Sequence, residues 1–429
     1  MRAKPGGSGD AAQPPCPSGH RRKGGAINHL SSLARQQPEE DGVPWSLIFL
    51  SLTAASWVYW LVAAWCVEQF FLEPQPPPDP KAPPVSILKP VRGLDSEAYK
   101  NFASFMLQDY PEYEVLFGVT DPKDPVLEVI ARLQREFPKR KIRAFVATPR
   151  GANDKVSILC HLAQMAYYDT LVICDSDMRV TPDYLRRICA PLQDPAVGLV
   201  TCLYRGTQAE TLTAKLEAQY IATTFLPGVL VGRNYLHMRF ALGASNALRR
   251  PQLREIGGFE ALADYLADDY QLGARVAATG HRVHLSDYMA QSILGPTTFR
   301  EQWNRELRWA KCLRVSRPLE YPALLFTLPT PMALLAAAAT GFSPLGMGAL
   351  GMSVALRWLV GWQVARRTHD DLYRSSWYLL PLRDILTYII WCAASVGRQV
   401  TWRGRRFALR KGGFLQQLFS QQEAHEAAR

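Results

Sequence analysis

The chain has 429 residues, 48% of them hydrophobic, and a formal net charge of +11. This length allows one large domain with additions, or two to three domains. A basic balance can serve nucleic acid, anionic lipid or phosphorylated substrates, but no helix-turn-helix, zinc-finger or RNA-binding signature is present, which disfavours nucleic acid. The eight cysteines form no CxxC pair, which argues against structural zinc and a thioredoxin-like site.

The N-terminal region predicts a tail followed by a membrane anchor. Residues 1–42 are rich in glycine, proline, serine and charge, so we expect them to be disordered. Residues 43–67 contain no charged side chain and exceed the ~20 residues that span a bilayer. Their tryptophans suggest anchors at the membrane interface, and a buried soluble helix is the alternative. Residues 73–84 are dominated by proline and predict a stiff linker.

Strands and helices alternate after the linker. Short apolar runs bounded by turn residues predict strands at 85–90, 113–119, 142–147, 171–174 and 198–204. Helical spacing predicts helices at 96–108, 125–137, 155–168 and 182–191. This alternation indicates an α/β domain with a mostly parallel sheet.

Two carboxylates follow the fourth predicted strand. Leu171–Cys174 is typical of a strand buried on both faces, and Asp175 and Asp177 come directly after it. Ligands of open α/β sheets bind at this carboxyl edge, where Asp95 and Asp121 also fall. Alternate residues on a strand point the same way, so both carboxylates can face one cation bound to a substrate diphosphate. Taken alone, an Asp-x-Asp is a weak signal that also fits a solvated turn.

Further elements follow this carboxylate pair. Residues 211–232 predict a long helix that covers the sheet or touches the bilayer, with a membrane span as the alternative. Residues 242–248 predict a strand whose small residues let a ligand approach the backbone. Residues 266–271 open another helix with Asp268 and Asp269 in its first turn, where the helix dipole by itself favours carboxylates.

The helix predicted over residues 299–313 carries Arg305, Arg308 and Trp309. The Arg-x-x-Arg spacing places both guanidinium groups on one face, and a guanidinium binds phosphate through two parallel hydrogen bonds. The helix therefore fits a role in closing over a diphosphate, or it is a basic helix that lies on anionic lipid. Trp309 is either part of the core or a stacking surface for the acceptor or a sugar.

The C-terminal third predicts membrane helices. Residues 321–356 contain no charge and are broken by prolines, so we expect a hairpin of two helices that extends beyond this run. Arg357 is expected near an interface or in a protein contact. Residues 379–396 would cross again, with Arg383 and Asp384 either paired or at the interface. The number of crossings stays open, and the basic C-terminal segment indicates a cytoplasmic tail.

Four motifs in chain order carry a resemblance to a known family. They read Lys89-Pro-Val-Arg-Gly-Leu-Asp95, Cys174-Asp-Ser-Asp-Met-Arg-Val180, Ala267-Asp-Asp-Tyr270 and Arg305-Glu-Leu-Arg-Trp309. This set resembles the ceramide glucosyltransferases, a family of inverting glycosyltransferases with the GT-A fold, over about residues 84–315. The stretch that begins at Trp402 also resembles the family's tail. Residues 197–206 and 258–270 look more like the bacterial, hopanoid-associated branch, which transfers N-acetylglucosamine to a hydroxylated hopanoid.

The resemblance implies a role for each motif residue: Asp269 as catalytic base, Asp177 and Asp175 as metal ligands, Asp95, Asp175, Arg305 and Arg308 as donor-binding groups, and Trp309 at the acceptor. It also implies Mg²⁺ or Mn²⁺ as the cofactor and a UDP-sugar as the donor. Asp268, beside the base, is not expected to act as the base. One departure is that Phe225-Leu-Pro227 stands where animal members carry His-Pro, which argues against the animal mode of binding ceramide.

The residue types suit this reaction. A carboxylate within reach of a lipid hydroxyl can take its proton as the bond to the sugar forms. A divalent cation and arginines can stabilise the leaving diphosphate. One base and one metal suffice for a single in-line displacement, so the anomeric configuration should invert, whereas a glycoside hydrolase uses two carboxylates that flank the bond.

We therefore predict an α/β, GT-A-type (Rossmann-like) glycosyltransferase domain with membrane-spanning α-helices. The predicted parts are a disordered tail (1–42), a transmembrane helix (43–67), the glycosyltransferase domain (84–315), C-terminal transmembrane helices (321–400) and a basic cytoplasmic tail (401–429). The predicted reaction moves N-acetylglucosamine to a hydroxylated hopanoid such as bacteriohopanetetrol, and ceramide glucosylation from UDP-glucose is the alternative. A processive polysaccharide synthase and a non-catalytic lipid-binding scaffold are further alternatives. The expected location is a bacterial inner membrane, with the catalytic domain facing the cytoplasm and no nucleic-acid partner.

Overall fold

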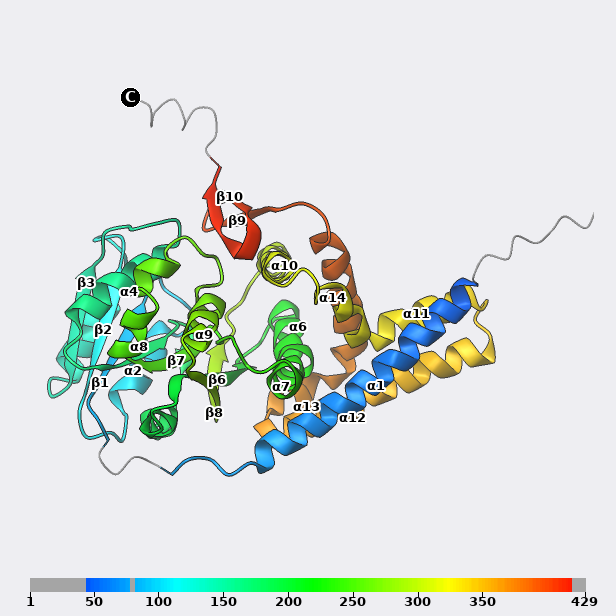
Figure 1. The fold of residues 1–429 in the computed structure, drawn as a ribbon, viewed down its shortest axis with the longest axis horizontal. Coiled ribbons are helices and arrows are strands. Elements are labelled where there is room, and N and C mark those ends of the chain that lie inside the picture. Colours follow the sequence, from blue (N-terminus) through cyan, green and yellow to red (C-terminus); the bar gives the residue numbers. More distant parts are fainter. Residues whose placement is uncertain (1–43, 78–81, 419–429) are drawn as a thin grey trace, which may run out of the picture. The chain divides into compact units, whose positions relative to one another are not determined.

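The computed structural model describes residues 44–77 and 82–418. The tail predicted for residues 1–42 lies outside the described residues, and so does the end of the chain after Leu418. Figure 1 shows a twisted sheet with helices on its faces and, apart from it, the apolar helices α1 (Trp45–Leu72), α11 (Pro329–Ala339) and α12 (Pro344–Thr368) side by side.

One eight-stranded sheet forms the centre of the α/β domain, with the strand order β3-β2-β1-β4-β7-β6-β8-β5. The strands are β1 (Val85–Pro90), β2 (Tyr113–Val119), β3 (Lys141–Val146), β4 (Thr170–Cys174), β5 (Met178–Arg179), β6 (Val197–Thr207), β7 (Ser245–Arg249) and β8 (Arg282–Ile293). β3, β2, β1 and β4 are parallel neighbours, and β6 is parallel to β8. β7 lies antiparallel between β4 and β6, and β5 is antiparallel to β8. The predicted α/β class with a parallel-rich sheet is confirmed.

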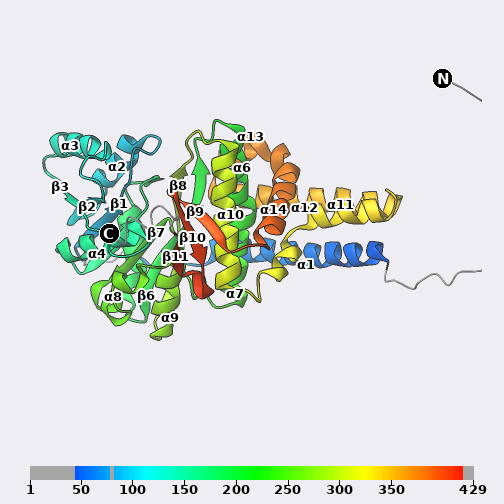
Figure 2. The same cartoon turned by 90° about the horizontal axis from the view of Figure 1, so that it is seen from above.

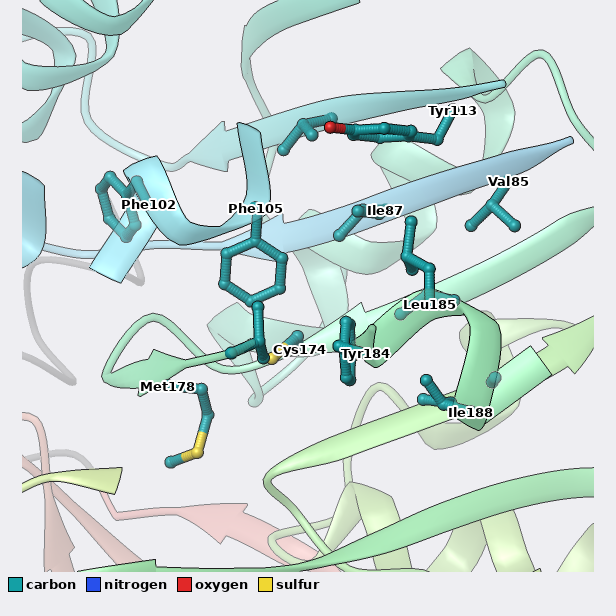
Figure 3. Close-up of a cluster of buried hydrophobic side chains, with 14 of the residues drawn as sticks. Val85, Ile87, Phe102, Phe105, Tyr113, Cys174, Met178, Tyr184, Leu185 and Ile188 are labelled. Atoms are coloured by element: carbon teal, nitrogen blue, oxygen red, sulfur yellow. The ribbon is translucent and has the colours of Figure 1, made fainter. Parts of the chain in front are cut away.

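Helices cover both faces of this sheet. The first face carries α2 (Ala98–Met106), α3 (Val126–Glu136) and α5 (Tyr184–Cys189), and the second carries α4 (Asp154–Met165), α8 (Arg250–Glu255) and α9 (Asp268–Ala278). Figure 3 shows the first core at the end of β4, where Phe105 and Tyr184 lie beside Cys174 with their rings 5.9 Å apart. Burial on both faces explains the apolar run of β4, and it fixes the point at which Asp175 leaves the sheet.

The long strand β8 is absent from the sequence-based prediction. It has 12 residues and pairs along β6 with two register shifts. Its sequence mixes histidine, serine, aspartate and glutamine with apolar residues, so no uniform run or alternation marks it. Its last residues pair with β5, and Ser292 thereby comes next to the segment that follows Asp177.

The helix predicted over residues 211–232 is interrupted. It consists of α6 (Leu212–Tyr220), a π-helical turn (Ile221–Phe225) and α7 (Leu226–Tyr235). This segment contacts the sheet on one side and α1, α12 and α14 (Leu380–Ala394) on the other. It therefore covers the sheet as predicted, and it separates the sheet from the apolar helices, as Figure 2 shows from above.

Two helices, α1 and α12, are long and apolar enough to cross a membrane. α11 has 11 residues and is shorter than a full crossing, so the predicted hairpin has one long and one short arm. α1, α11 and α12 pack against one another, and Trp57 Nε1 donates to Ser353 Oγ at 2.8 Å. Trp60 is fully buried and donates to the Thr327 carbonyl at 3.2 Å. It is thus a packing residue and not an interfacial anchor.

Two buried ion pairs lie among the C-terminal helices. Arg357 on α12 lies 2.7 Å from Asp384 on α14 and donates to the Thr223 carbonyl at 2.7 Å, which confirms the expected protein contact. Arg383 lies 2.6 Å from Glu306, a residue of α10 (Phe299–Ser316). Arg383 and Asp384 were predicted either to be paired or to mark an interfacial start, and both are paired, but with different partners because successive helical residues point in different directions.

The basic segment after residue 398 is folded as far as the structure describes it. It forms a three-stranded sheet of β9 (Gln399–Trp402), β10 (Arg405–Leu409) and β11 (Leu415–Gln417). Phe407, Leu409 and Leu415 are buried beneath it. The sheet packs on α10 and is drawn in red in Figure 1. Residues 401–418 are therefore part of the α/β domain and not a separate tail.

Candidate active site

The two carboxylates after β4 lie beside Asp95. Ser176 Oγ donates to Asp95 Oδ2, and Ser292 Oγ donates to Asp177 Oδ2 at 3.3 Å. Burial, and after it the negative charges of Asp175 and Asp95, raises the pKa of Asp177 to about 7. The three predicted carboxylates therefore gather at one edge of the sheet, where the charges of Asp175 and Asp95 disfavour the ionised form of Asp177.

Two lysines that the sequence analysis did not single out lie within this acidic group. Lys155 Nζ, in the first turn of α4, is 2.7 Å from Asp175 Oδ1 and 3.4 Å from Asp268 Oδ2. Burial by itself lowers the pKa of Lys155, but the surrounding carboxylates raise it above its ordinary value. Lys89 Nζ donates to the Asp175 carbonyl at 2.8 Å, and burial lowers its pKa. The position of Lys89 in the first motif could have identified it as a site residue, whereas nothing in the sequence distinguished Lys155.

Asp269 lies across a narrow space from Asp175. It is in the first turn of α9, and its Oδ1 accepts from the Tyr270 amide at 2.8 Å. A Cβ placed on Gly243 would lie 3.2 Å from Asp269 Oδ2 and 3.7 Å from Asp175 Oδ2. Both carboxylates therefore border the space that the missing side chain of Gly243 leaves open, as the small-residue segment predicted.

The environment of Asp269 suits a general base. Burial, and after it the neighbouring Asp268, raises the pKa of Asp269 to about 7, while Lys155 lowers it. A base works best when its pKa lies near the operating pH. Asp268 has other contacts, because it lies 3.4 Å from Lys155 Nζ and 3.5 Å from Asn153 Nδ2.

The two arginines of α10 have different surroundings. Arg305 forms an ion pair with the buried Glu217 of α6. Arg308 forms no ion pair or hydrogen bond with any residue in 44–77 or 82–418, and burial together with Arg305 and Arg403 lowers its pKa to about 10. Trp309 is 39% exposed, so it is not a core residue. Arg308 is therefore the motif arginine that is available to an anion.

A hairpin of the C-terminal sheet reaches the same site. Arg403 lies at the turn of this hairpin with φ of 52°. Burial and the positive charge of Arg92 lower its pKa, while the carboxylates of Asp175 and Asp95 act in the opposite direction. The guanidinium carbons of Arg308 and Arg403 lie 5.5 and 5.3 Å from the centre of the Trp402 ring. Sequence reasoning missed Arg403 because it treated this segment as a tail, although the resemblance from Trp402 onward was a signal.

The hairpin is held against the loop that carries the base. Arg405 lies 2.6 Å from Asp154 at the start of α4. The Leu266 amide donates to the Gly413 carbonyl at 3.1 Å, and Gln271 Nε2 donates to the Gly412 carbonyl at 2.9 Å. Residues before and after Asp269 are therefore hydrogen-bonded directly to the C-terminal segment. These bonds help to hold the segment that carries Asp269 in position.

The carboxylates after β4 fit a divalent cation that is shared with a diphosphate. Among the residues that the structure describes, no three histidine, cysteine or acidic side chains are grouped closely enough to hold a metal ion. Asp175 keeps Oδ2 on the side of the open space, and Asp177 is close enough to Asp175 and Asp95 for their charges to act on it. Mg²⁺ typically binds one or two carboxylates together with substrate phosphates. This donor set therefore matches a cation completed by the donor.

Comparisons with known proteins agree with this geometry. The family model described as glycosyl transferase family 21 matches residues 45–415. Ceramide glucosyltransferase 1 of Caenorhabditis elegans is 25% identical over 362 residues, which are 82% of this chain and 77% of the relative. Ceramide glucosyltransferase 3 of the same species is 28% identical over 240 residues, which are 56% and 52% of the two chains.

One solved structure supports the fold. It is the mannosyltransferase PcManGT from Pyrobaculum calidifontis in complex with GDP-Man and Mn²⁺. It aligns with a TM-score of 0.50 at 19% identity and covers 80% of this chain and 98% of its own. This likeness confirms the predicted glycosyltransferase fold class.

Proposed function

Because the chain belongs to glycosyl transferase family 21, we propose that it moves a sugar from a UDP-sugar to a hydroxyl group of a membrane lipid, with inversion at the anomeric carbon. The observation that carries this proposal is the placement of Asp269 and Asp175 on the two sides of the space beside Gly243. Asp269 faces the acceptor there, and Asp175 lies at the sheet edge where donors bind.

Asp269 takes the proton of the acceptor hydroxyl as the hydroxyl oxygen bonds to the anomeric carbon. With a pKa of about 7, a large share of this carboxyl is ionised at neutral pH and is still basic enough to accept the proton. Lys155 holds Asp175 and Asp268 in place with its ammonium group. The leaving diphosphate departs towards Arg308 and Arg403, whose guanidinium groups stabilise its charge.

The remaining predicted residues keep their proposed places with one change. Asp177 and Asp175 would hold Mg²⁺ or Mn²⁺, which supplies positive charge to the diphosphate when it is bound. Asp95 would contact the nucleotide, and Trp309 would contact the acceptor. Arg305 is engaged by Glu217, so we propose that it positions α10 and leaves the diphosphate to Arg308.

The identity of the lipid that accepts the sugar is a second, more specific proposal. The names of the two worm relatives support ceramide, whereas the hopanoid rests on the resemblance of residues 197–206 and 258–270. The stretch Phe225-Leu-Pro227 stands where animal members carry His-Pro, and the ring of Phe225 lies 5.1 Å from that of Tyr204. Burial raises the pKa of Tyr204, and Asp269 and Asp177 are among the charges that act on it. The substituted position therefore lies near the site and can influence the acceptor.

Lipid extraction and mass analysis test the reaction. The chain and its Asp269→Asn variant would be expressed in a host supplied with ceramide or with bacteriohopanetetrol. A ceramide that gains a hexose, or a hopanoid that gains an N-acetylhexosamine, only with the unchanged chain supports the proposal and selects the acceptor. A chain of linked sugars would indicate the processive synthase instead. Equal products from both proteins would remove Asp269 from the mechanism.

The apolar helices support a location of the protein in a membrane. α1 and α12 would anchor the protein in a bilayer, and the acceptor would be drawn from that bilayer. We propose that the catalytic domain faces the cytoplasm of a bacterium, where UDP-sugars are made. Protease accessibility of the domain in sealed inverted and right-side-out membrane vesicles checks this orientation.

A further inference from the structure

A second hollow, outside the site described above, lies beside the end of α1. Its volume is about 700 Å³, within the usual range for ligand sites. The last turns of α1, the end of α7 with the loop after it, and the start of β8 border it. None of the carboxylates or arginines assigned to catalysis lines it.

The lining of this hollow is basic. It includes three arginines and two histidines but one carboxylate: Arg233, Arg239, Arg282, His237, His281 and Glu73. Arg233 lies 2.6 Å from Glu73, and Arg282 forms an ion pair with Asp194. Arg239 is exposed and has no ion pair or hydrogen bond with any described residue. The hollow therefore holds a surplus of positive charge, and Arg239 is its unengaged cation.

The position of the hollow matches the edge of a bilayer. α1 carries no charged side chain before Glu68, so the apolar part of the helix ends there. Trp65, one turn earlier, lines the hollow and is 52% exposed, as is typical of tryptophan at a membrane interface. Tyr235 and Leu236 expose apolar surface at the end of α7. In a bilayer crossed by α1, these apolar side chains would meet the acyl region and the arginines would lie at headgroup level.

We propose that this hollow binds the phosphate headgroup of an anionic phospholipid of the bilayer that holds α1. The headgroup phosphate would accept hydrogen bonds from Arg239, and the acyl chains would lie along Trp65 and Tyr235, which both line the hollow. Arginine is well suited to such a phosphate, because its planar guanidinium matches two phosphate oxygens. The binding is separate from sugar transfer, so it does not rest on the proposed function.

Lipid retention measures this binding without any catalytic readout. The purified full chain in mild detergent would be given equal amounts of phosphatidylglycerol and phosphatidylcholine with the same acyl chains, and bound lipid would be counted by native mass spectrometry. We expect preferential retention of phosphatidylglycerol, and Arg239→Glu should lower it about fivefold or more, since one basic residue near an anionic surface contributes about a factor of five.

Arg366→Glu is the matched control. Arg366 is exposed in the last turn of α12, where its neighbour Arg367 forms an ion pair with Glu68, so it lies at the same level of α1 but outside the hollow. It also has no ion pair with a described residue. An equal loss of phosphatidylglycerol in both variants, or no preference in the unchanged chain, would overturn the proposal. Unchanged melting temperatures show that each variant is folded.

The same chemistry would also suit a soluble phosphate, and a competition experiment separates the two sources. Glycerol 3-phosphate carries the phosphate without acyl chains. If it displaces phosphatidylglycerol at similar concentrations, the assignment to a bilayer lipid is overturned. If displacement needs a large excess, the acyl contacts with Trp65 and Tyr235 contribute and the lipid assignment stands.

Discussion

At the scale of single residues, the site consists of buried charges that are only partly balanced. Burial raises the pKa values of Asp177 and Asp269 to about 7, and their carboxylate neighbours add to the effect. Lys155 and Lys89 supply the nearest positive charges. Clustered, strongly shifted pKa values are typical of functional sites. A bound cation and diphosphate would balance these carboxylates, so the arrangement favours ligand binding.

Replacing the base should separate catalysis from donor binding. In Asp269→Asn we expect turnover to fall by about 10²- to 10⁴-fold, the usual contribution of general base catalysis, while UDP affinity stays unchanged. Transfer from labelled donor and calorimetric UDP binding would measure the two quantities. Asp268→Asn is the control, because Asp268 contacts Lys155 and Asn153. An equally large loss of turnover in Asp268→Asn would show that the assignment of Asp269 as the base is wrong.

The same carboxyl predicts opposite pH trends for activity and stability. Activity should rise through a pH of about 7 as Asp269 ionises. The folded pKa lies above the ordinary value of 3.8, so the folded state holds the proton more tightly and its stability falls as pH rises from about 4 to 7. Asp269→Asn should therefore unfold at a higher temperature than the unchanged chain at pH 8, with little difference near pH 4. An equal difference at both pH values would contradict this linkage.

The second carboxylate of the pair should govern metal-dependent donor binding. Asp177→Ala removes the carboxylate that we propose as a metal ligand, so we expect Mn²⁺ to lose its effect on UDP affinity in a titration. Asp121→Ala is the matched control, because Asp121 also follows a strand of this sheet but is exposed and bonds only to a nearby backbone amide. Unchanged Mn²⁺ dependence in Asp177→Ala would refute the assignment.

At the scale of elements, the site is assembled by three segments that are distant in the chain. β4 delivers Asp175 and Asp177, the first turn of α9 delivers Asp269, and the β9–β10 hairpin delivers Arg403. Trp402 lies between Arg308 and Arg403, and its ring contacts both. The C-terminal hairpin and α10 therefore contribute neighbouring arginines, Arg403 and Arg308, to the same site as the carboxylates of the sheet edge.

The hairpin should contribute to donor affinity. In Arg403→Ala we expect the KM for the UDP-sugar to rise by about 10- to 100-fold, because a hydrogen bond to a charged group contributes about 1.5 to 3 kcal/mol. Steady-state kinetics at saturating acceptor would measure it. Arg406→Ala is the control on the neighbouring strand, since Arg406 is exposed and bonds to Gln399 at 3.0 Å. Equal KM values in the two variants would exclude a donor contact by Arg403.

At the scale of the whole described chain, buried ion pairs connect the apolar helices to the α/β domain. Arg383 on α14 bonds to Glu306 on α10, one residue from Arg305. Arg357 on α12 bonds to Asp384 and to the π-helical turn at Thr223. Buried pairs are seldom a net gain over apolar packing, but the loss of one partner leaves an uncompensated charge. One pair therefore ties α10 to α14, and the other ties α14 to α12.

Removing one of these partners should destabilise the protein. Asp384→Ala leaves Arg357 buried without its carboxylate, and we expect the free energy of unfolding to fall by about 3 to 5 kcal/mol. Thermal and denaturant unfolding in detergent would measure it. Asp371→Ala removes an exposed carboxylate that pairs with Arg374 at 3.3 Å, and it should change stability little. A similar small effect in both variants would show that Asp384 is not structurally required.

The boundaries of the first four parallel strands followed closely from the sequence. β1 and β2 matched their predicted limits, because burial along their whole length selects mostly apolar residues between polar turns. The sequence pattern did not predict β8 or the C-terminal sheet, because their polar and basic residues bind partners that only the folded chain brings close. Lys155 was missed for the same reason: a lysine at the start of a helix carries no sign of the two carboxylates it will meet.

The sequence by itself determined the fold class, the family and the set of candidate carboxylates, because these depend on local periodicity and on motifs that are contiguous in the chain. Only the tertiary structure decided which groups face one another. It paired Arg305 with Glu217 and left Arg308 unengaged, and it sent Arg383 and Asp384 to different partners. It also carried Arg403 back to the acidic sheet edge. Such choices depend on distances between segments far apart in the chain, and no local pattern encodes those distances.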